Sequence, residues 1–443
     1  MTSLPTNTKV CQWFPQLASS LDRRSAKRLV LLFVGAVLAR GRRAVTSWIR
    51  AAGLSTQFRS CYIAVAAAGK TADKISTQLL MTVITPLVKH SQRLTLALDD
   101  TPTQRYGPHV QGAGIDHNPT PGPAGSLHVY GHVFVVLGLL VKHKAWGVIT
   151  LPLLARLYVR KIDLPKIDPK HRPAFRTKLD MGVELLSWAS SLLKSLGKPI
   201  WVVADGAYAK APLLKPAMAL GMTVVSRLRK DAALWSVPPS PRKGQRGRPR
   251  IYGADRINLA KRGGQRRGWT TDKFDLYGKP TSKRYKTFLA TWGPVGGVIR
   301  VVLVDESAGW IAFFCTDVTA SVADILTTVA DRFSLEITFR DCKEIVGAGQ
   351  QQVRFVWANV GAFHLCLWRF TMTEAWAWAQ AEQELVDRSA SPWDSPNRRP
   401  SHADKRRAWR RELLGEEIQA VLHPGVTEAE IQAAVDRLLG LAA

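Results

Sequence analysis

The stretch RLTLALDDTPTQR (residues 93–105) leads from an apolar run into two adjacent carboxylates, Asp99 and Asp100. Alternating apolar and β-branched residues predict a buried strand over residues 93–98, with the acidic pair at its end. The chain around it is strongly basic, with 62 Lys and Arg against 34 Asp and Glu and a formal net charge of +28. Two acids at the end of an apolar strand in such a chain are therefore the first candidates for a functional site.

The bulk composition points to a globular protein with a polyanionic partner. A chain of 443 residues has room for two or three domains, and 46% hydrophobic residues are enough for a sizeable core. A positive charge spread along the whole length favours nucleic acid as the first candidate partner and an anionic membrane surface as the second.

The sequence predicts no membrane span. Its longest apolar run, residues 129–141, has 13 residues and is too short to cross a bilayer, and MTSLPTNTKV at the start has no apolar signal core. The five cysteines are scattered, without a CxxC pair, which favours a reducing compartment and no zinc site. We expect a cytoplasmic protein, nucleoid-associated when bound to DNA.

The region after the first strand follows an order typical of an α/β core. Strand and helix patterns alternate as β-β-β-α-β-α-β, over residues 93–98, 128–141, 145–154, 175–196, 199–205, 210–221 and 222–228. The fourth strand, PIWVVAD, ends at Asp205. Carboxylates therefore stand at the carboxyl ends of the first and fourth strands, where α/β sheets build their sites.

A long helix is predicted from about Ser321, with a charged stripe beside its apolar one. The apolar stripe consists of Val322, Leu326, Val329, Phe333 and Ile337. Arg332, Glu336 and Lys343 lie at i, i+4 and i+11, which places them on one second stripe of a regular helix. For a lone helix, an ordinary salt-bridged surface explains these charges, and a functional site is the alternative.

Three carboxylates from two strands and a helix favour a site for hard divalent cations. Asp99 or Asp100, Asp205 and Glu336 would supply oxygen ligands of the kind that Mg²⁺ prefers. Two such ions can stabilise the attacking and leaving oxygens of a displacement at phosphorus. Arg332 and Lys343 would then act on the phosphates as electrostatic clamps. Taken singly, each aspartate is also explained as a turn or cap residue.

These motifs together resemble the DDE transposases of bacterial insertion sequences. VADRFSLEITFRDCK contains Arg332, Glu336 and Lys343 at the spacing of the branch with a Y-(2)-R-(3)-E-(6)-K signature, but Val329 occupies the tyrosine position. LALDDTPT resembles the first-aspartate strand and VVADGAYAK the second. The resemblance extends from about residue 20 to 415. It implies an α/β fold with a ribonuclease-H-like mixed sheet core.

The resemblance also implies site residues and chemistry. The acid directly after the apolar strand is the ligand in the family, which favours Asp99 over Asp100, so Asp99, Asp205 and Glu336 are the expected catalytic and metal-binding residues. Mg²⁺ or Mn²⁺ is the expected cofactor, with two ions per site, and no nucleotide cofactor. In the family the signature tyrosine assists contacts at the transposon end, so Val329 departs from the pattern at that contact.

The expected activity is cleavage of double-stranded DNA at element ends and transfer of the 3′-hydroxyl into target DNA, by a dimer in the DNA complex. A DNA-binding protein derived from such an enzyme and a nuclease of the same core fold are the alternatives. Inverted repeats flanking several copies of the gene would favour the transposase.

The predicted organisation has five parts. They are a helical N-terminal DNA-binding domain (1–88), the first part of the catalytic core (89–228), a basic β-rich insertion (229–308), the second part of the core (309–384), and a linker with C-terminal helices (385–443). Two short helices across Gly41 fit either a helix-turn-helix or a small bundle with basic faces. Beyond the clamps, the expected DNA-binding residues are Arg42, Arg43, Arg246, Arg248 and Arg250.

Overall fold

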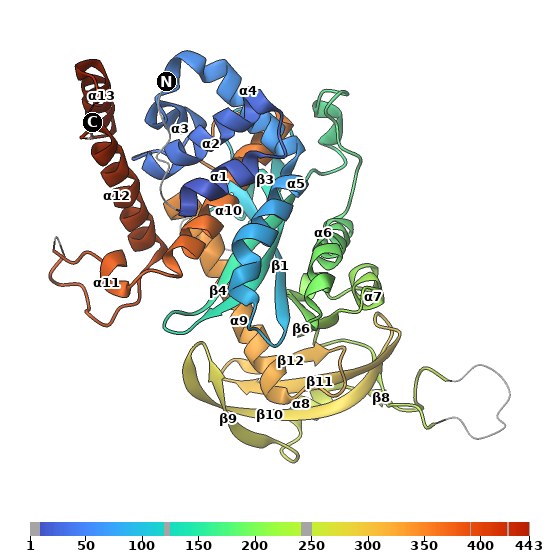
Figure 1. The fold of residues 1–443 in the computed structure, drawn as a ribbon. Coiled ribbons are helices and arrows are strands. Elements are labelled where there is room, and N and C mark those ends of the chain that lie inside the picture. The colour runs from blue at the N-terminus through green and yellow to red at the C-terminus, as the bar shows by residue number, and fades with distance from the viewer. Residues whose placement is uncertain (1–8, 119–124, 241–249, 390, 423–424, 443) are drawn as a thin grey trace.

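The computed structural model describes residues 9–118, 125–240, 250–389, 391–422 and 425–442. Its N-terminal region is helical, as predicted (Figure 1). The helices are α1 (Lys9–Ala18), α2 (Arg23–Leu38), α3 (Val45–Ala51), α4 (Phe58–Lys70) and α5 (Ala72–Gln78), followed by the turns η2 (Leu79–Ile84) and η3 (Thr85–Val88). Asp22 begins α2, because its carboxylate accepts the backbone N–H groups of Arg24 and Ser25. These N-terminal helices lead directly into β1, the first strand of the core.

A single mixed sheet of 12 strands forms the centre of the protein. Its strand order is β2-β3-β1-β5-β6-β12-β11-β10-β7-β8, with β4 paired to β3 and β9 to β10. The strands are β1 (Leu94–Gln104), β2 (Gly114–His117), β3 (His128–His143), β4 (Gly147–Tyr158), β5 (Ile200–Ala204), β6 (Thr223–Leu228), β7 (Leu234–Trp235), β8 (Arg256–Ile257), β9 (Thr270–Leu276), β10 (Lys279–Trp292), β11 (Gly297–Glu306) and β12 (Gly309–Cys315). This mixed sheet with helices is the predicted α/β, ribonuclease-H-like fold.

Parallel pairing is confined to the middle of the sheet. Strand β5 pairs in parallel with β1 on one side and with β6 on the other, and the remaining pairs are antiparallel. All five residues of β5 are buried, as expected of a strand covered on both faces. Strands β1, β5 and β6 therefore run in the same direction at the centre of the sheet.

The first strand is longer than predicted. The sequence places its end at residue 98, but β1 continues to Gln104, because β3 pairs with it from Thr95 to Gln104. Only the parallel pairing with β5 stops at Leu98, opposite Ala204. Asp99 and Asp100 therefore lie within β1, at the point where its ladder with β5 ends.

Helices cover both faces of the sheet. They are α6 (Lys178–Leu193), α7 (Ala211–Ala219), α9 (Val322–Asp341) with the π-helical turn η7 (Cys342–Val346), and α10 (Val356–Ala377). Gly197 ends the α6 region in the left-handed conformation, with φ of 62°, which glycine adopts without steric cost. The strands β9, β10 and β11 of the predicted insertion extend the same sheet away from the N-terminal helices (Figure 1).

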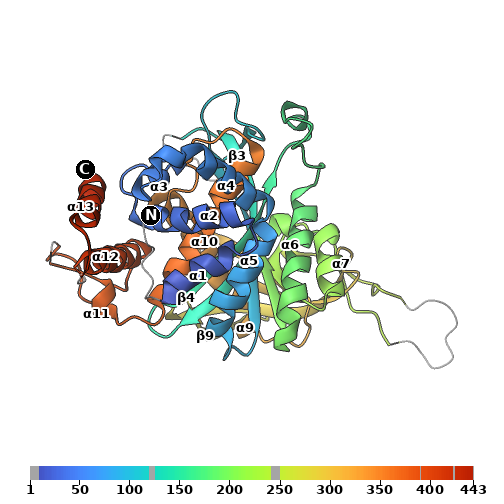
Figure 2. The same cartoon turned by 45° about the horizontal axis from the view of Figure 1, so that its top comes forward.

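Helix α10, which contains Trp357, Trp368 and Trp376, is buried at every residue except Trp357. Helix α10 packs against α4, β4 and the C-terminal helix α12 (His402–Val421), and α13 (Glu428–Ala442) follows α12 (Figure 2). A Cβ added at Gly361 would lie 1.9 Å from the carbonyl oxygen of Val65, and one added at Gly69 would lie 2.1 Å from that of Trp357. Two glycines therefore permit the close crossing of α4 and α10.

Buried charges fix α12 to α10. Glu374 of α10 accepts hydrogen bonds from His402 (2.7 Å) and Lys405 (2.6 Å) of α12. Burial by itself raises the pKa of Glu374, but Lys405 and His402 outweigh it and lower the pKa to about 2. Arg406 and Arg410 donate to the carbonyls of Ala39 and Leu38 at the end of α2. Lys405, Arg406 and Arg410 of α12 therefore bind groups of the protein itself.

In the described part of the chain, no helix has the length and apolar character needed to cross a bilayer.

Candidate active site

Strand register brings the first two predicted acids together. Leu98 of β1 pairs in parallel with Ala204 of β5. The residue that follows each of them is an aspartate, Asp99 after Leu98 and Asp205 after Ala204. Residues in register on parallel strands point to the same face of a sheet. Asp205 lies close enough for its charge to raise the pKa of Asp99. The two acids therefore form one pair at the end of the β1–β5 ladder.

Helix α9 brings the third predicted acid toward this pair. It begins where the sequence predicts, because the Ser321 hydroxyl accepts the backbone N–H of Asp324 at 3.0 Å. Two turns of helix or more then carry Arg332 and Glu336 to the level of β1. Nη1 of Arg332 donates to Asp99 at 2.8 Å, and Nη2 donates to Glu336 at 2.7 Å. The guanidinium therefore bridges the strand acid and the helix acid.

The apolar stripe predicted for α9 is only partly right. Leu326 is buried, but Phe333 is 47% exposed and packs edge-on against Tyr277 in the turn between β9 and β10. The buried face instead includes Ile325, Leu335 and Phe339. The helix contacts the β9 strand as well as β1, β3 and β4, so its apolar residues serve two surfaces.

Burial dominates the electrostatics of Asp99. Its side chain is 19% exposed, and burial raises its pKa to about 6, although Arg332 opposes the rise. The charges of Asp100 and Asp205 raise the pKa further. Asp99 is therefore short of compensating positive charge even with the guanidinium in place.

Asp205 is the open member of the set. It is exposed after the buried strand β5, and its carboxylate has no hydrogen bond or ion pair within the described residues. Its backbone carbonyl accepts the N–H of Tyr208 and so holds the short turn η6 (Gly206–Tyr208). The side chain thus stands free at the carboxyl edge of the sheet.

Asp100 lies on the opposite face of β1. Its carboxylate accepts from Lys178 of α6 at 2.6 Å and from the hydroxyl of Tyr208 at 3.0 Å. Burial, followed by the charges of Asp100 and Asp99, raises the pKa of Tyr208, which keeps this hydroxyl protonated as a donor. Asp100 is therefore tied into the packing between β1, α6 and η6.

The donor set fits a hard divalent cation by its chemistry. Asp99, Asp205 and Glu336 offer carboxylate oxygens, and the first two repel each other without a cation between them. Among the described residues, no three His, Cys, Asp or Glu side chains lie close enough together to hold a metal ion. The guanidinium of Arg332 lies between Asp99 and Glu336 and donates to both.

Lys343 lies outside this bridge. Helix α9 ends at Asp341, and Lys343 belongs to the π-helical turn η7, so it does not keep the regular helical spacing that its predicted stripe assumed. It is half-buried, and burial lowers its pKa.

The predicted DNA-binding arginines fall into three settings. Arg42 is exposed beside the 349–354 segment, and Arg43 is half-buried, with its backbone N–H donating to Gln350 Oε1 at 2.8 Å. Arg250 is exposed. Arg246 and Arg248 lie outside the described residues, so their role stays a prediction.

The sequence analysis missed the residues that hold Asp100 and the buried Arg105. Lys178 and Tyr208 lie 78 and 108 positions from Asp100, and no local pattern connects them. Arg105 stands in the opening stretch at an even spacing from Asp99, which on a strand indicates the same face. The two-residue repeat of a strand could therefore have predicted that Arg105 points to the same side as Asp99.

A mixed sheet that places two strand carboxylates beside an acidic helix defines the class of DDE nucleases, which cleave nucleic acid on a ribonuclease-H-like core. Comparison with protein families agrees. The chain belongs to the DDE superfamily endonuclease family, whose model matches residues 16–276, more than half of the 443 residues. The match confirms the resemblance to DDE transposases. It includes Asp99 and Asp205 and ends before Glu336, and the Y-R-E-K branch stays a prediction. A search of curated proteins found no match.

Proposed function

We propose that the chain is a transposase that cuts double-stranded DNA at the ends of a mobile element and joins the 3′-hydroxyl to target DNA. The observation that carries the proposal is the register Leu98–Ala204, which sets Asp99 beside Asp205 on the face where α9 presents Glu336. The family supports DNA as the substrate.

In this proposal Asp99, Asp205 and Glu336 hold Mg²⁺ or Mn²⁺, with two ions per site. The ions would supply Lewis-acid stabilisation for the attacking and leaving oxygens at phosphorus. Arg332, which bridges Asp99 and Glu336 in this structure, would contact the phosphate as an electrostatic clamp. Lys343 and the arginines Arg42, Arg43, Arg246, Arg248 and Arg250 would bind the DNA backbone.

The chain's own residues prepare the site for this role. Burial keeps Asp99 with little competing water, so a cation gains more from its carboxylate than from a solvated one. Asp205, exposed and unpartnered within the described residues, is accessible from the solvent side. Bringing two DNA ends together would require a dimer in the DNA complex.

The test is a cleavage assay on labelled duplexes taken from the flanks of the gene, with Mg²⁺ or Mn²⁺, together with a supercoiled target plasmid. We expect metal-dependent nicking at a fixed flank position and joined products in the plasmid. Nicking without joining would assign a nuclease of the same fold. Tight binding without nicking in either metal would assign a DNA-binding protein derived from a transposase.

A further inference from the structure

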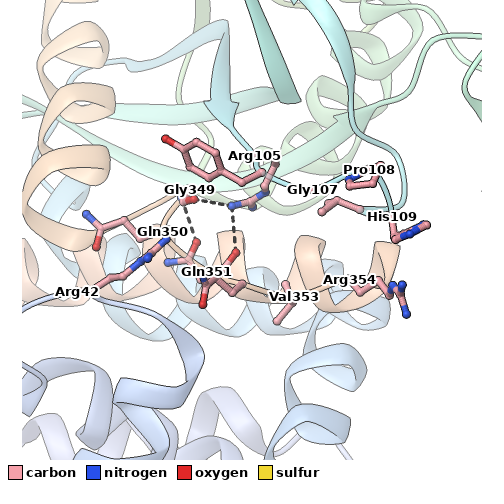
Figure 3. Close-up of a pocket in the computed structure, with 13 residues that line it drawn as sticks. Arg42, Arg105, Gly107, Pro108, His109, Gly349, Gln350, Gln351, Val353 and Arg354 are labelled. Carbon is pink, nitrogen blue, oxygen red and sulfur yellow. Dashed lines mark hydrogen bonds between the residues drawn. The ribbon is translucent and has the colours of Figure 1, made fainter.

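A basic pocket lies where the N-terminal helices meet the end of β1. Its volume is about 280 Å³, and it is lined by residues of three segments, among them Arg42, Arg105, His109, Gln350 and Arg354 (Figure 3). Arg42 comes from the α2–α3 connection, Arg105 follows β1, and Arg354 precedes α10. No carboxylate is among the described residues that line it. The pocket therefore concentrates positive charge without an internal counter-ion.

Arg105 is the buried base of this pocket. It is 4% exposed, and burial lowers its pKa to about 10, so it remains charged at neutral pH. Its Nη1 donates to the carbonyls of Gly349 (2.7 Å) and Gln351 (3.3 Å). Its Nη2 is buried and has no hydrogen-bond partner in the described structure. A buried guanidinium with one unpartnered nitrogen and no carboxylate among its hydrogen-bond acceptors gains free energy from an anion placed nearby.

The third partner of Arg105 adds no negative charge. Nε of Arg105 donates to Nδ1 of His132 at 3.0 Å, and Nε2 of His132 lies 2.9 Å from the carbonyl oxygen of Gln111. Burial lowers the pKa of His132 to about 3, so this ring is neutral and accepts at Nδ1. The charge of Arg105 is therefore uncompensated by any of its three neighbours.

The rim of the pocket offers direct contacts to an anion. Arg42, His109 and Arg354 are exposed, and no side-chain hydrogen bond or ion pair engages them in the described residues. Arginine forms bidentate hydrogen bonds with phosphate oxygens. Two such arginines above a buried third match a singly charged phosphodiester group.

We propose that this pocket seats one backbone phosphate of the DNA duplex away from the point of cleavage. The inference rests on the proposed function, which supplies DNA as the partner, and it adds the site on the protein where the DNA backbone is bound. Arg105 directly follows β1, six residues beyond Asp99, which at about 3.3 Å per residue is roughly 20 Å along the strand direction. For a duplex whose axis runs along β1, a rise of about 3.4 Å per nucleotide sets the seated phosphate about six nucleotides from the scissile one.

The decisive comparison uses the double variant Arg42→Ala/Arg354→Ala. Its matched control is Lys89→Ala/Lys194→Ala, which removes two exposed cations beyond the opposite ends of β1 and β5. Both variants lose the same charge, and all four side chains are exposed, so folding is checked simply by thermal melting. Binding to a flank duplex is measured from 50 to 200 mM salt.

We expect the pocket variant to bind the duplex at least tenfold more weakly, and the slope of its salt dependence to be smaller by about 0.9. In the control variant, the change in slope should be less than half as large. A series of duplexes, each with one uncharged methylphosphonate, should reveal one position, about six nucleotides from the cut, that weakens wild type but not the pocket variant. Equal losses in both variants, or no such position, would overturn the proposal.

Free phosphate is the other source of the same chemistry. Inorganic phosphate that binds wild type through Arg42 and Arg354, with duplex affinity unchanged in the double variant, would overturn the DNA assignment. A cleavage assay with wild type separates this proposal from the proposed function. If wild type shows no nicking in either metal but keeps the methylphosphonate effect, only the enzymatic function is refuted. Normal nicking with no methylphosphonate effect refutes only the pocket.

Discussion

Asp99 and Asp100 are neighbours of one residue type on one strand, yet the two faces of β1 give them different chemistry. On the α9 face, Asp99 meets one guanidinium and a second carboxylate, and burial raises its pKa to about 6. On the α6 face, Asp100 receives an ammonium and a phenol hydroxyl. One carboxylate is left short of positive charge, and the other is matched.

The difference lies in the kind of partner, because both oxygens of each carboxylate are hydrogen-bonded. Those of Asp99 accept from the backbone N–H of Asp100 at 2.8 Å and from Arg332, which Asp99 shares with Glu336. Lys178 and Tyr208 already occupy both oxygens of Asp100, so binding a cation there would require breaking two bonds. Asp99 and Glu336 share a single arginine, and Asp205 has no side-chain partner among the described residues. We therefore expect a cation to bind on the α9 face rather than at Asp100.

The largest expected effect is the loss of cleavage in Asp99→Asn, with Asp100→Asn as the comparison on the other face. Losing a metal ligand should remove several kcal/mol of transition-state stabilisation, so we expect nicking by Asp99→Asn to fall about 1000-fold. Asp100→Asn should keep nicking within about tenfold of wild type. Rates on the flank duplex check both, with DNA affinity as the control. A larger loss in Asp100→Asn than in Asp99→Asn would reverse the assignment of the two faces.

Stability should respond on the opposite face. Tyr208 is 2% exposed and donates to Asp100, so Tyr208→Phe should lower the free energy of unfolding by about 2 kcal/mol, as for a buried hydrogen bond to a charged group. Tyr285→Phe is the matched control, since the Tyr285 hydroxyl donates to Asp272 at 2.7 Å where both atoms are exposed. Urea unfolding measures the two. Equal losses would show that Asp100 is not held by a buried bond.

The affinity for Mn²⁺ tests whether Arg332 competes with a metal ion on the α9 face of β1. Replacing the bridging guanidinium by Arg332→Gln removes a competing cation, and we expect Mn²⁺ to bind about tenfold more tightly, or about 1.4 kcal/mol. Arg340→Gln is the control on the same helix, because Arg340 is 60% exposed and pairs with the adjacent Asp341. Calorimetric titration without DNA measures both. Weaker Mn²⁺ binding in Arg332→Gln would mean that Arg332 positions the acids rather than competes for them.

The smallest effect concerns pH. Because the pKa of Asp99 is raised to about 6, the ionised fraction that can bind a cation falls as pH drops below 7. At limiting Mg²⁺, nicking should fall about fourfold between pH 7 and pH 5.5, and saturating Mg²⁺ should shift the midpoint to lower pH. A flat profile at limiting metal would contradict the raised pKa.

Local sequence patterns were sufficient for much of the fold. The apolar run before Asp99, the buried run before Asp205 and the cap at Ser321 each depend on neighbours within a few residues, and the structure confirms the elements they predicted. The length of β1 was underestimated because its continuation to Gln104 depends on pairing with β3, more than twenty-five residues away.

The sequence by itself determined the α/β class, the acids that end the central pairing and the charged helix, because strand and helix periods are written locally. Only the tertiary structure decided which face each acid occupies, since α9 and α6 approach β1 from opposite sides. It also decided that Arg332 bridges Asp99 and Glu336, and that Arg105 lies buried with no ion pair among the residues that the structure describes. Those properties depend on distance in space and on exclusion of water, which no spacing along the chain encodes.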